Sequence, residues 1–341
     1  MPHICYFIPM VKACLKNFLI LLIPAFILFP ADSYAKVFKK NMTVMGTALE
    51  VTVSSDGPAK AEGAFAIVYK EMSRIEDEMS EWKDGTYVSL INRNAGKKAV
   101  KVPDELFKLI AASIQVSEIT DGAFDITWAA MRGVWDFTPG RERVPSPEEV
   151  RGRLGLVDYR KIELDEKNRT VFLKGEGMAM GLGAIAKGYA VDRAMRAVAD
   201  SGIKDAIIRA GGDMRVQGLD DEGKPWEIGI RQPREKDKLL ARLRLTNISI
   251  STSGDYERFF IKDNVLYHHI MDPKTGYPAK ACRSVTILAP DTMTSDALST
   301  AVFVLGPQKG MELIKKLKGV EGIIVDSDGA VHTSPGIRIN R

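Results

Sequence analysis

The sequence contains little cysteine and little histidine. Its 341 residues include three Cys and four His. Cys5 and Cys14 lie in the N-terminal segment, so removal of that segment would leave Cys282 alone, which excludes a disulfide within the chain. A chain of this length is long enough for a large hydrophobic core and for one or two domains. We therefore expect a protein that is held together by its core.

The sequence also lacks a strong excess of charge of either sign. It has 48 Lys and Arg residues against 44 Asp and Glu residues, which gives a net charge of +4, and it has no long basic run. Proteins that bind nucleic acid usually carry a basic patch or stripe. The balanced charge therefore argues against nucleic acid as the main partner.

The hydrophobic run near the N-terminus is too short for a comfortable membrane span, which needs about 20 apolar residues. This run, residues 18–29, follows Lys12 and Lys16 and precedes Ser33-Tyr34-Ala35, a pattern of small residues around position 34. A basic start, a short apolar run and such a pattern are typical of a secretory signal peptide.

We therefore expect residues 1–35 to be a signal peptide and residues 36–341 to be one exported, periplasmic catalytic domain. The alternative is an uncleaved anchor, in which residues 12–30 hold the protein at the inner membrane or associate it with the membrane surface. Met10 is a second possible start of translation besides Met1.

Repeats of fixed period and low-complexity linkers are absent from the sequence as well. Apolar spacing predicts helices over residues 58–79, 104–120, 184–200, 295–305 and 307–318. Alternation and β-branched residues predict strands over residues 43–53, 169–173, 205–210, 226–231, 248–252, 258–261, 265–270, 284–288 and 322–325. Residues 132–147 are polar and contain Pro, which indicates an excursion or a lid. Helices mixed with hairpin-like strands favour an α+β fold over a parallel sheet.

The most informative stretch runs from His268 to Pro278. Two adjacent His are followed by Asp272, a Pro and Gly276, which together predict a rigid turn that holds His269 and Asp272 in fixed directions. Because side chains alternate along a strand, only one of the two His side chains points inward. An inward His is more often a core residue whose ring nitrogens are hydrogen-bonded than a catalytic residue.

Asp296 and Thr300 are spaced i, i+4, so on a helix they lie on the same face. A carboxylate and a hydroxyl are hard oxygen ligands of the kind that Mg²⁺ accepts beside a phosphate. The structural alternative is a capped helix start, in which Asp296 favours the positive end and Thr300 bonds back to a carbonyl.

Three further motifs each allow a binding role and a structural role. Gly181 to Gly188 is a Gly-rich turn that leads into a helix and could hold a phosphate, and it fits the G-x-G-x-x-A pattern of nicotinamide dehydrogenases. Gly211-Gly212-Asp213 is typical of a hairpin turn. Trp82 could stack on a flat ring or simply pack.

The order of these motifs carries more information than any one of them. The series reads Met45-Gly46-Thr47, Ser80 with Ser89-Leu90-Ile91-Asn92, Gly122-Ala123-Phe124-Asp125, Gly183-Ala184-Ile185-Ala186-Lys187-Gly188-Tyr189-Ala190-Val191-Asp192, Gly211-Gly212-Asp213, Thr252-Ser253-Gly254-Asp255-Tyr256, His269-Ile270-Met271-Asp272-Pro273-Lys274-Thr275-Gly276 and Ser295-Asp296-Ala297-Leu298-Ser299-Thr300-Ala301. This series closely resembles the FAD:protein FMN transferase (ApbE) family over about residues 40–330.

The resemblance implies an exported, Mg²⁺-dependent enzyme with an α+β, T-fold-like architecture of mixed sheets with flanking helices in a single catalytic domain. It implies that FAD is cleaved at its pyrophosphate, that FMN is transferred to a Thr or Ser hydroxyl of an acceptor protein, and that AMP is released. The acceptors of the family are subunits of membrane redox complexes and other exported flavoproteins.

The resemblance also assigns roles to residues of this chain. Asp296 and Thr300 would bind Mg²⁺ through their side chains and Ala184 through its backbone carbonyl. His269 would be the catalytic base, and Asp272 would shape its loop. The residues expected at the FAD site are Met45, Trp82, Ala123, Phe124, Asp125, Gly181, Lys187 and Ile270.

The chain departs from the family pattern at Gly181, where many members have an Asp that contacts FAD. Weaker flavin affinity or a changed flavin pose is the expected consequence. Two other functions stay open at this point: an FAD pyrophosphatase that gives FMN and AMP, and a periplasmic FAD-binding protein with little chemistry.

Overall fold

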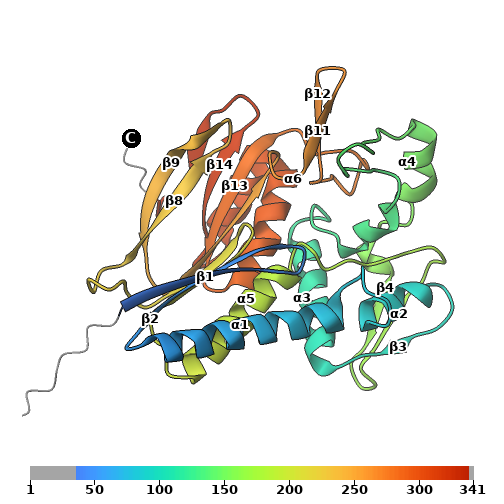
Figure 1. The fold of residues 1–341 in the computed structure, drawn as a ribbon. Helices are drawn as coiled ribbons and strands as arrows, with labels where there is room; N and C mark the ends of the chain where they lie inside the picture. The colour runs from blue at the N-terminus through green and yellow to red at the C-terminus, as the bar shows by residue number, and fades with distance from the viewer. Residues whose placement is uncertain (1–35, 338–341) are drawn as a thin grey trace, which may run out of the picture. The chain divides into compact units, whose positions relative to one another are not determined.

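The computed structural model describes residues 36–337, so the expected signal peptide lies outside the described residues. Its main feature is an antiparallel eight-stranded sheet with the strand order β1-β2-β6-β7-β10-β13-β14-β15 (Figure 1). The strands are β1 (Lys36–Val44), β2 (Thr47–Ser55), β6 (Ala206–Ala210), β7 (Asp213–Gln217), β10 (Ile248–Gly254), β13 (Cys282–Ala289), β14 (Glu321–Asp326) and β15 (Val331–Thr333).

The two faces of this sheet are covered by different elements. The helices α1 (Pro58–Met79), α5 (Ala186–Asp200) and α6 (Thr292–Lys316) pack on one face, where Leu49, Val51 and Val53 of β2 are buried against α1 and α5. The hairpin of β8 (Trp226–Gln232) and β9 (Glu235–Leu245) covers the other face. Because side chains alternate across a strand, β6 contributes to both cores, with Ile208 on the helix side and Ile207 on the hairpin side.

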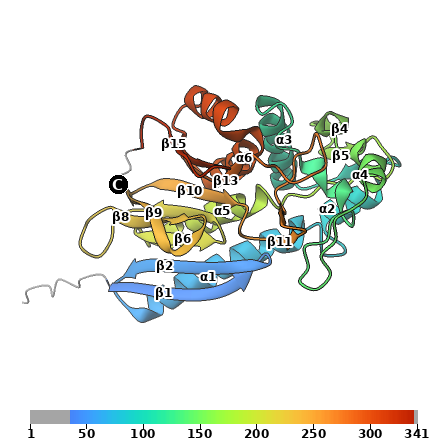
Figure 2. The same ribbon diagram turned by 90° about the horizontal axis from the view of Figure 1, so that it is seen from above.

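The remaining elements gather at the end of the sheet opposite the β8–β9 hairpin (Figures 1 and 2). They are α2 (Tyr87–Arg93), β3 (Val100–Lys101), α3 (Asp104–Ile119), the 3-10 helices η1 (Ile126–Met131) and η2 (Tyr159–Lys161), α4 (Pro147–Leu154), β4 (Ile162–Asp165), β5 (Thr170–Leu173), β11 (Phe259–Lys262) and β12 (Val265–His268). The predicted α+β class with mixed sheets and flanking helices is confirmed.

Two local predictions need correction. The strand predicted over residues 43–53 is a hairpin, because Met45 and Gly46 have φ of 52° and 66° and reverse the chain. The stretch 132–147, expected to be an excursion or a lid, belongs in part to the core, since Trp135 is buried and packs edge-on against Tyr277 with ring centroids 5.7 Å apart. The two helices predicted over residues 295–305 and 307–318 are both present within α6, and they meet at Gly306, where the backbone is non-helical with a φ of 79°.

A row of buried hydroxyl pairs fixes how α6 lies on β10. The side chains of Ser249, Ser251 and Ser253 lie on the same face of β10, because they are two residues apart. Their oxygens lie 2.8 Å from hydroxyls of α6 in the pairs Ser249–Thr292, Ser251–Ser295 and Ser253–Ser299. Each pair satisfies hydroxyls that lie between the helix and the strand, so the row ties α6 to β10 at three points along its first half.

Within residues 36–337, no helix combines the length and the apolar character that a membrane crossing requires.

Candidate active site

The Gly-rich stretch before α5 is held in place by two neighbouring segments. The side-chain amide of Asn92 accepts a hydrogen bond from Met180 N at 2.8 Å and donates one to Met180 O at 2.9 Å. Gly181 N donates to Ile126 O at 2.8 Å. These bonds fix the backbone that leads into α5, so the first turn of α5 has a defined position.

That first turn places Lys187 between two carboxylates. Its ammonium lies 3.0 Å from Asp213 Oδ2 and 3.4 Å from Asp296 Oδ2, and it donates to Gly183 O at 2.8 Å. Asp213 begins β7 and Asp296 lies in the second turn of α6, so three elements meet at this point. Both carboxylates are 3% exposed, which makes their attraction to Lys187 stronger than that of surface pairs.

Burial and charge shift the pKa values of this cluster in a consistent way. Burial and, second, the neighbouring charge of Asp213 raise the pKa of Asp296 to about 7, against the opposing effect of Lys187. Burial by itself would lower the pKa of Lys187, but the two carboxylates outweigh it and raise that pKa. Lys187 therefore stays positively charged near pH 7. A further positive charge close to Asp296 would stabilise the ionised form of its carboxyl group.

The backbone supplies one more oxygen beside these side chains. Gly188 lies in the first turn of α5, where backbone N–H groups have no acceptor within the helix, and its N donates to Asp296 Oδ2 at 3.0 Å. Among residues 36–337, no hydrogen bond ends on the carbonyl of Ala184, which lies just before this turn. This carbonyl oxygen is therefore available to a ligand.

Thr300 follows Asp296 by one turn on the same face of α6. Its hydroxyl lies 3.4 Å from Ser253 Oγ, at the end of the row of hydroxyl pairs. Of the residues that sequence analysis expected at the metal and flavin sites, Lys187 and Asp296 are in contact, and Thr300 lies one turn beyond Asp296 on α6. Ala184 precedes Lys187 by three residues, just before α5.

Gly188 permits the close approach of α5 and α6. A Cβ at this position would lie 2.3 Å from Thr292 O and 2.8 Å from Asp296 Cβ. Replacement of Gly188 by Ala should therefore separate the two helices and lower the free energy of unfolding by about 1–3 kcal/mol. Chemical denaturation checks this, with Gly63→Ala in α1 as the control, because a Cβ at Gly63 meets no atom within 4 Å. Equal stability of the two variants would contradict the packing role of Gly188.

The two adjacent His have opposite environments. His268 is buried, packs edge-on against Phe303 of α6, donates from Nε2 to Ala279 O at 2.7 Å and accepts at Nδ1 from Ile270 N at 3.2 Å. His269 points outward and is exposed. The prediction that only one His faces inward is confirmed, and His268 is the satisfied core residue.

The contacts of His269 define its reactive atom. Nδ1 lies 3.3 Å from Arg258 O, and since a carbonyl only accepts, we assign the proton to Nδ1. This leaves Nε2 as an unprotonated acceptor. Surrounding protein atoms, then the charges of Arg258 and, to a smaller extent, Lys187 lower the pKa of His269, although the access of the ring to solvent limits this lowering. A neutral imidazole near pH 7 is suited to accept a proton.

Asp272 belongs to the turn and not to the reacting groups. Its carboxylate accepts Lys274 N at 2.9 Å, and its carbonyl accepts Gly276 N at 2.9 Å. Gly276 has a φ of 77° and its carbonyl accepts Trp135 Nε1 at 2.9 Å. The turn is thus rigid, as expected, and Asp272 shapes it.

The residues expected at the flavin site come from several separate segments of the chain. Trp82 is 74% exposed, and the guanidinium of Arg132 lies 4.0 Å from its ring centroid. Ala123, Phe124 and Ile270 are buried, and Met45 lies in the β1–β2 turn. The exposed Trp82 ring offers a flat apolar surface for stacking.

Asp125, another residue expected at the flavin site, makes structural hydrogen bonds. It caps η1, with Oδ1 accepting Thr127 N at 2.8 Å and Oδ2 accepting Tyr159 N at 2.9 Å. Burial raises the pKa of Asp125, against the effect of these hydrogen bonds. Both carboxylate oxygens have partners, so the side chain ties η1 to the backbone at Tyr159.

Sequence reasoning missed the role of Asp213 and of Asn92. On its own, Gly211-Gly212-Asp213 is typical of a hairpin turn, and only its place in the ordered series of motifs indicated more. The tight turn is needed here, because a Cβ at Gly212 would lie 2.5 Å from Thr252 O. That close packing sets the start of β7 and so directs Asp213 to Lys187.

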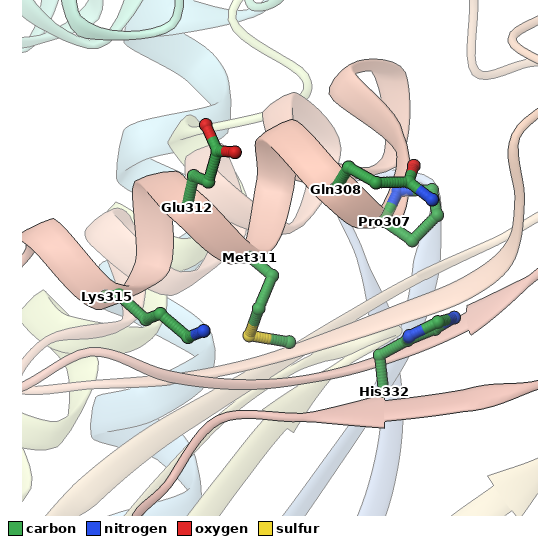
Figure 3. Close-up of a pocket in the computed structure, with 6 residues that line it drawn as sticks. All are labelled: Pro307, Gln308, Met311, Glu312, Lys315 and His332. Carbon is green, nitrogen blue, oxygen red and sulfur yellow. The ribbon is translucent and has the colours of Figure 1, made fainter.

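A surface groove of about 280 Å³ lies along the second half of α6 (Figure 3). Its lining residues are Pro307, Gln308, Met311, Glu312, Lys315 and His332. None of the candidate site residues lines it, so it is separate from the cluster around Lys187.

The fold and this cluster define an α+β protein with a buried lysine between two carboxylates where α5, β7 and α6 meet. Residues 45–324 match the model of the ApbE family, and the chain belongs to that family.

Known proteins of the family are similar over most of this chain. The FAD:protein FMN transferase of Treponema pallidum is 33% identical over 88% of this chain and 87% of its own length. That of Haemophilus influenzae is 31% identical over 87% of this chain and 89% of its own length. The crystal structure of the ApbE protein of Thermotoga maritima, 36% identical, superposes with a TM-score of 0.82 and covers 88% of this chain and 98% of that one.

Proposed function

We propose that the protein transfers FMN from FAD to a Thr or Ser hydroxyl of an exported acceptor flavoprotein and releases AMP. The observation that carries this proposal is the junction of α5, β7 and α6, where Lys187 lies between Asp213 and Asp296 beside the open Ala184 carbonyl. The names of the relatives, FAD:protein FMN transferase, support flavin transfer as the class of reaction.

The donor set at this junction fits a magnesium ion. The Asp296 carboxylate, the Thr300 hydroxyl and the Ala184 carbonyl are all hard oxygen ligands, and a raised pKa of Asp296 reflects a need for positive charge. Among residues 36–337, no three His, Cys, Asp or Glu side chains cluster as a metal site, so phosphate oxygens and water would complete the shell. When bound, Mg²⁺ would neutralise charge on the pyrophosphate.

The chain's own residues would carry the rest of the reaction. The acceptor hydroxyl oxygen forms a bond to the phosphorus of the FMN half of FAD, and the bond from that phosphorus to the AMP oxygen breaks. His269 Nε2 takes the proton of the hydroxyl, because a neutral Thr or Ser is a poor nucleophile. Lys187 and the backbone at the start of α5 stabilise the charge that develops on the phosphates.

The acceptor is proposed to be a subunit of a redox complex or another exported flavoprotein. This follows from the expected signal peptide over residues 1–35, with anchoring by residues 12–30 as the alternative. Both segments lie outside the described residues, so export stays a prediction.

Mass spectrometry of an acceptor peptide or protein with a Thr-containing flavinylation motif tests the function. After incubation with enzyme, FAD and Mg²⁺, we expect a mass gain that corresponds to FMN, together with one AMP per transfer. Chelation of Mg²⁺ should abolish the gain. Unmodified acceptor and intact FAD would instead indicate a flavin-binding protein.

A second candidate function is hydrolysis of FAD to FMN and AMP. The exposure of His269 favours it, since water can reach the proposed base. If free FMN appears at the same rate with and without acceptor, hydrolysis is the main reaction and transfer is not.

A further inference from the structure

The space beside Gly181 is filled by the side chain of Glu81. A Cβ at position 181 would lie 2.8 Å from Glu81 Oε1 and 3.2 Å from Ala129 Cβ. Gly181 does not have a positive φ, so the backbone alone would accept an L-residue here. A side chain at position 181 would therefore have to displace the flexible end of the Glu81 side chain from the space that it fills.

The Glu81 carboxylate lacks the partners that a nearly buried acid usually has. Its side chain is 13% exposed, and its nearest cation is Arg132, with Nη2 at 3.6 Å from Oε1. In the part of the chain that the structure describes, no group donates a hydrogen bond to the Glu81 side chain. The carboxylate keeps some access to solvent and has free acceptor positions, so a donor of a ligand could bond to it.

The surroundings of Glu81 indicate the kind of ligand. Trp82, the next residue, presents an exposed ring, and Arg132 lies over it while donating from Nη1 to Glu81 O at 3.4 Å. A flat ring can stack on Trp82, and a hydroxyl or N–H group of the same molecule can donate to the adjacent carboxylate. A flavin nucleotide combines these groups.

We propose that Glu81 is an FAD-binding residue, whose carboxylate takes the place of a longer side chain at position 181 and accepts a hydrogen bond from the flavin nucleotide. This proposal rests on the proposed function, because it assumes that FAD binds beside Trp82. Positions 81 and 181 are then interdependent, because the ligand needs one carboxylate as a hydrogen-bond acceptor and either position can supply it.

A double-mutant cycle on the full mature chain tests the pair, with the dissociation constant of FAD measured by flavin fluorescence quenching. Glu81→Ala should weaken FAD binding about tenfold, and Glu81→Gln should weaken it less. Gly181→Asp should also weaken binding about tenfold, because its carboxylate crowds Glu81. The double variant Glu81→Ala/Gly181→Asp should bind within about threefold of wild type, which shows coupling.

Kinetics and stability separate a binding role from a structural one. Glu81→Ala should raise KM for FAD and leave kcat within about twofold, while its Tm stays near that of wild type. If Gly181→Asp fails to fold, the comparison of Glu81→Ala with Glu81→Gln still tests whether the Glu81 carboxylate binds FAD. A dissociation constant within twofold of wild type for both Glu81 variants would overturn the proposal.

The proposed function and this inference fail in different ways. Wild-type protein that neither binds FAD nor modifies an acceptor would overturn both. A second outcome would overturn only the role of Glu81. In it, the wild-type protein binds FAD and transfers FMN, but the dissociation constant of the double variant rises by the product of the two factors measured for the single variants.

Discussion

Replacement of Asp296 by Asn should lower the rate of FMN transfer at least about 100-fold. The amide keeps the shape of the side chain and an acceptor for Gly188 N, but it removes the charged oxygen that is the proposed main ligand of Mg²⁺. It also leaves Lys187 with Asp213 as its carboxylate partner. Steady-state transfer to an acceptor, followed by flavin fluorescence of the modified protein over a range of Mg²⁺ concentrations, measures the effect.

The loss of activity should not come from unfolding. Because burial and Asp213 raise the pKa of Asp296 to about 7, which is above the usual carboxyl value, the ionised form of Asp296 destabilises the folded state above that pH. The Tm of Asp296→Asn at pH 8 should therefore not fall below that of wild type. Asp291→Asn is the matched control on the same helix, since Asn caps α6 as well as Asp does. Transfer by Asp296→Asn within threefold of wild type would remove Asp296 from the metal site.

Replacement of His269 by Ala should lower kcat for transfer about 100- to 10,000-fold, the range expected for loss of a general base. The ring is exposed and held only at its Nδ1 side, so its removal should leave the fold and the FAD affinity nearly unchanged. His332→Gln, at the groove on the second half of α6, is the control and should transfer at the wild-type rate. An unchanged kcat for His269→Ala would exclude this residue as the base.

The pH dependence of kcat for transfer should follow the protonation of His269. Since the pKa of His269 is lowered, the imidazole is neutral above its usual value of about 6.5 and becomes protonated only in more acid solution. At saturating Mg²⁺ and FAD, kcat should stay flat from about pH 7 upward and fall on acidification with a midpoint below 6.5. In His269→Ala this fall of kcat at low pH should disappear. A midpoint above 7 in the wild type would contradict the assignment.

The fold class was predictable because local patterns dominate it. The helix over residues 58–79 was predicted with its observed bounds, since Pro58 starts it and apolar residues recur along one face. The hairpin at Met45 was missed, because alternation continues through the turn and only the left-handed backbone interrupts it. The strand β9 was missed as well, since its exposed face is rich in charged residues.

The sequence by itself determined which candidate oxygen ligands, candidate base and Gly-rich turn the protein has, and their order along the chain indicated the ApbE family. Only the tertiary structure decided which of them meet. Asp213 reaches Lys187 because Gly212 lets β7 begin against Thr252, and Gly188 N in the first turn of α5 bonds to Asp296 of α6. Likewise Glu81 lies against Gly181 across 100 residues of chain. Such contacts depend on how helices pack, and no local pattern records them.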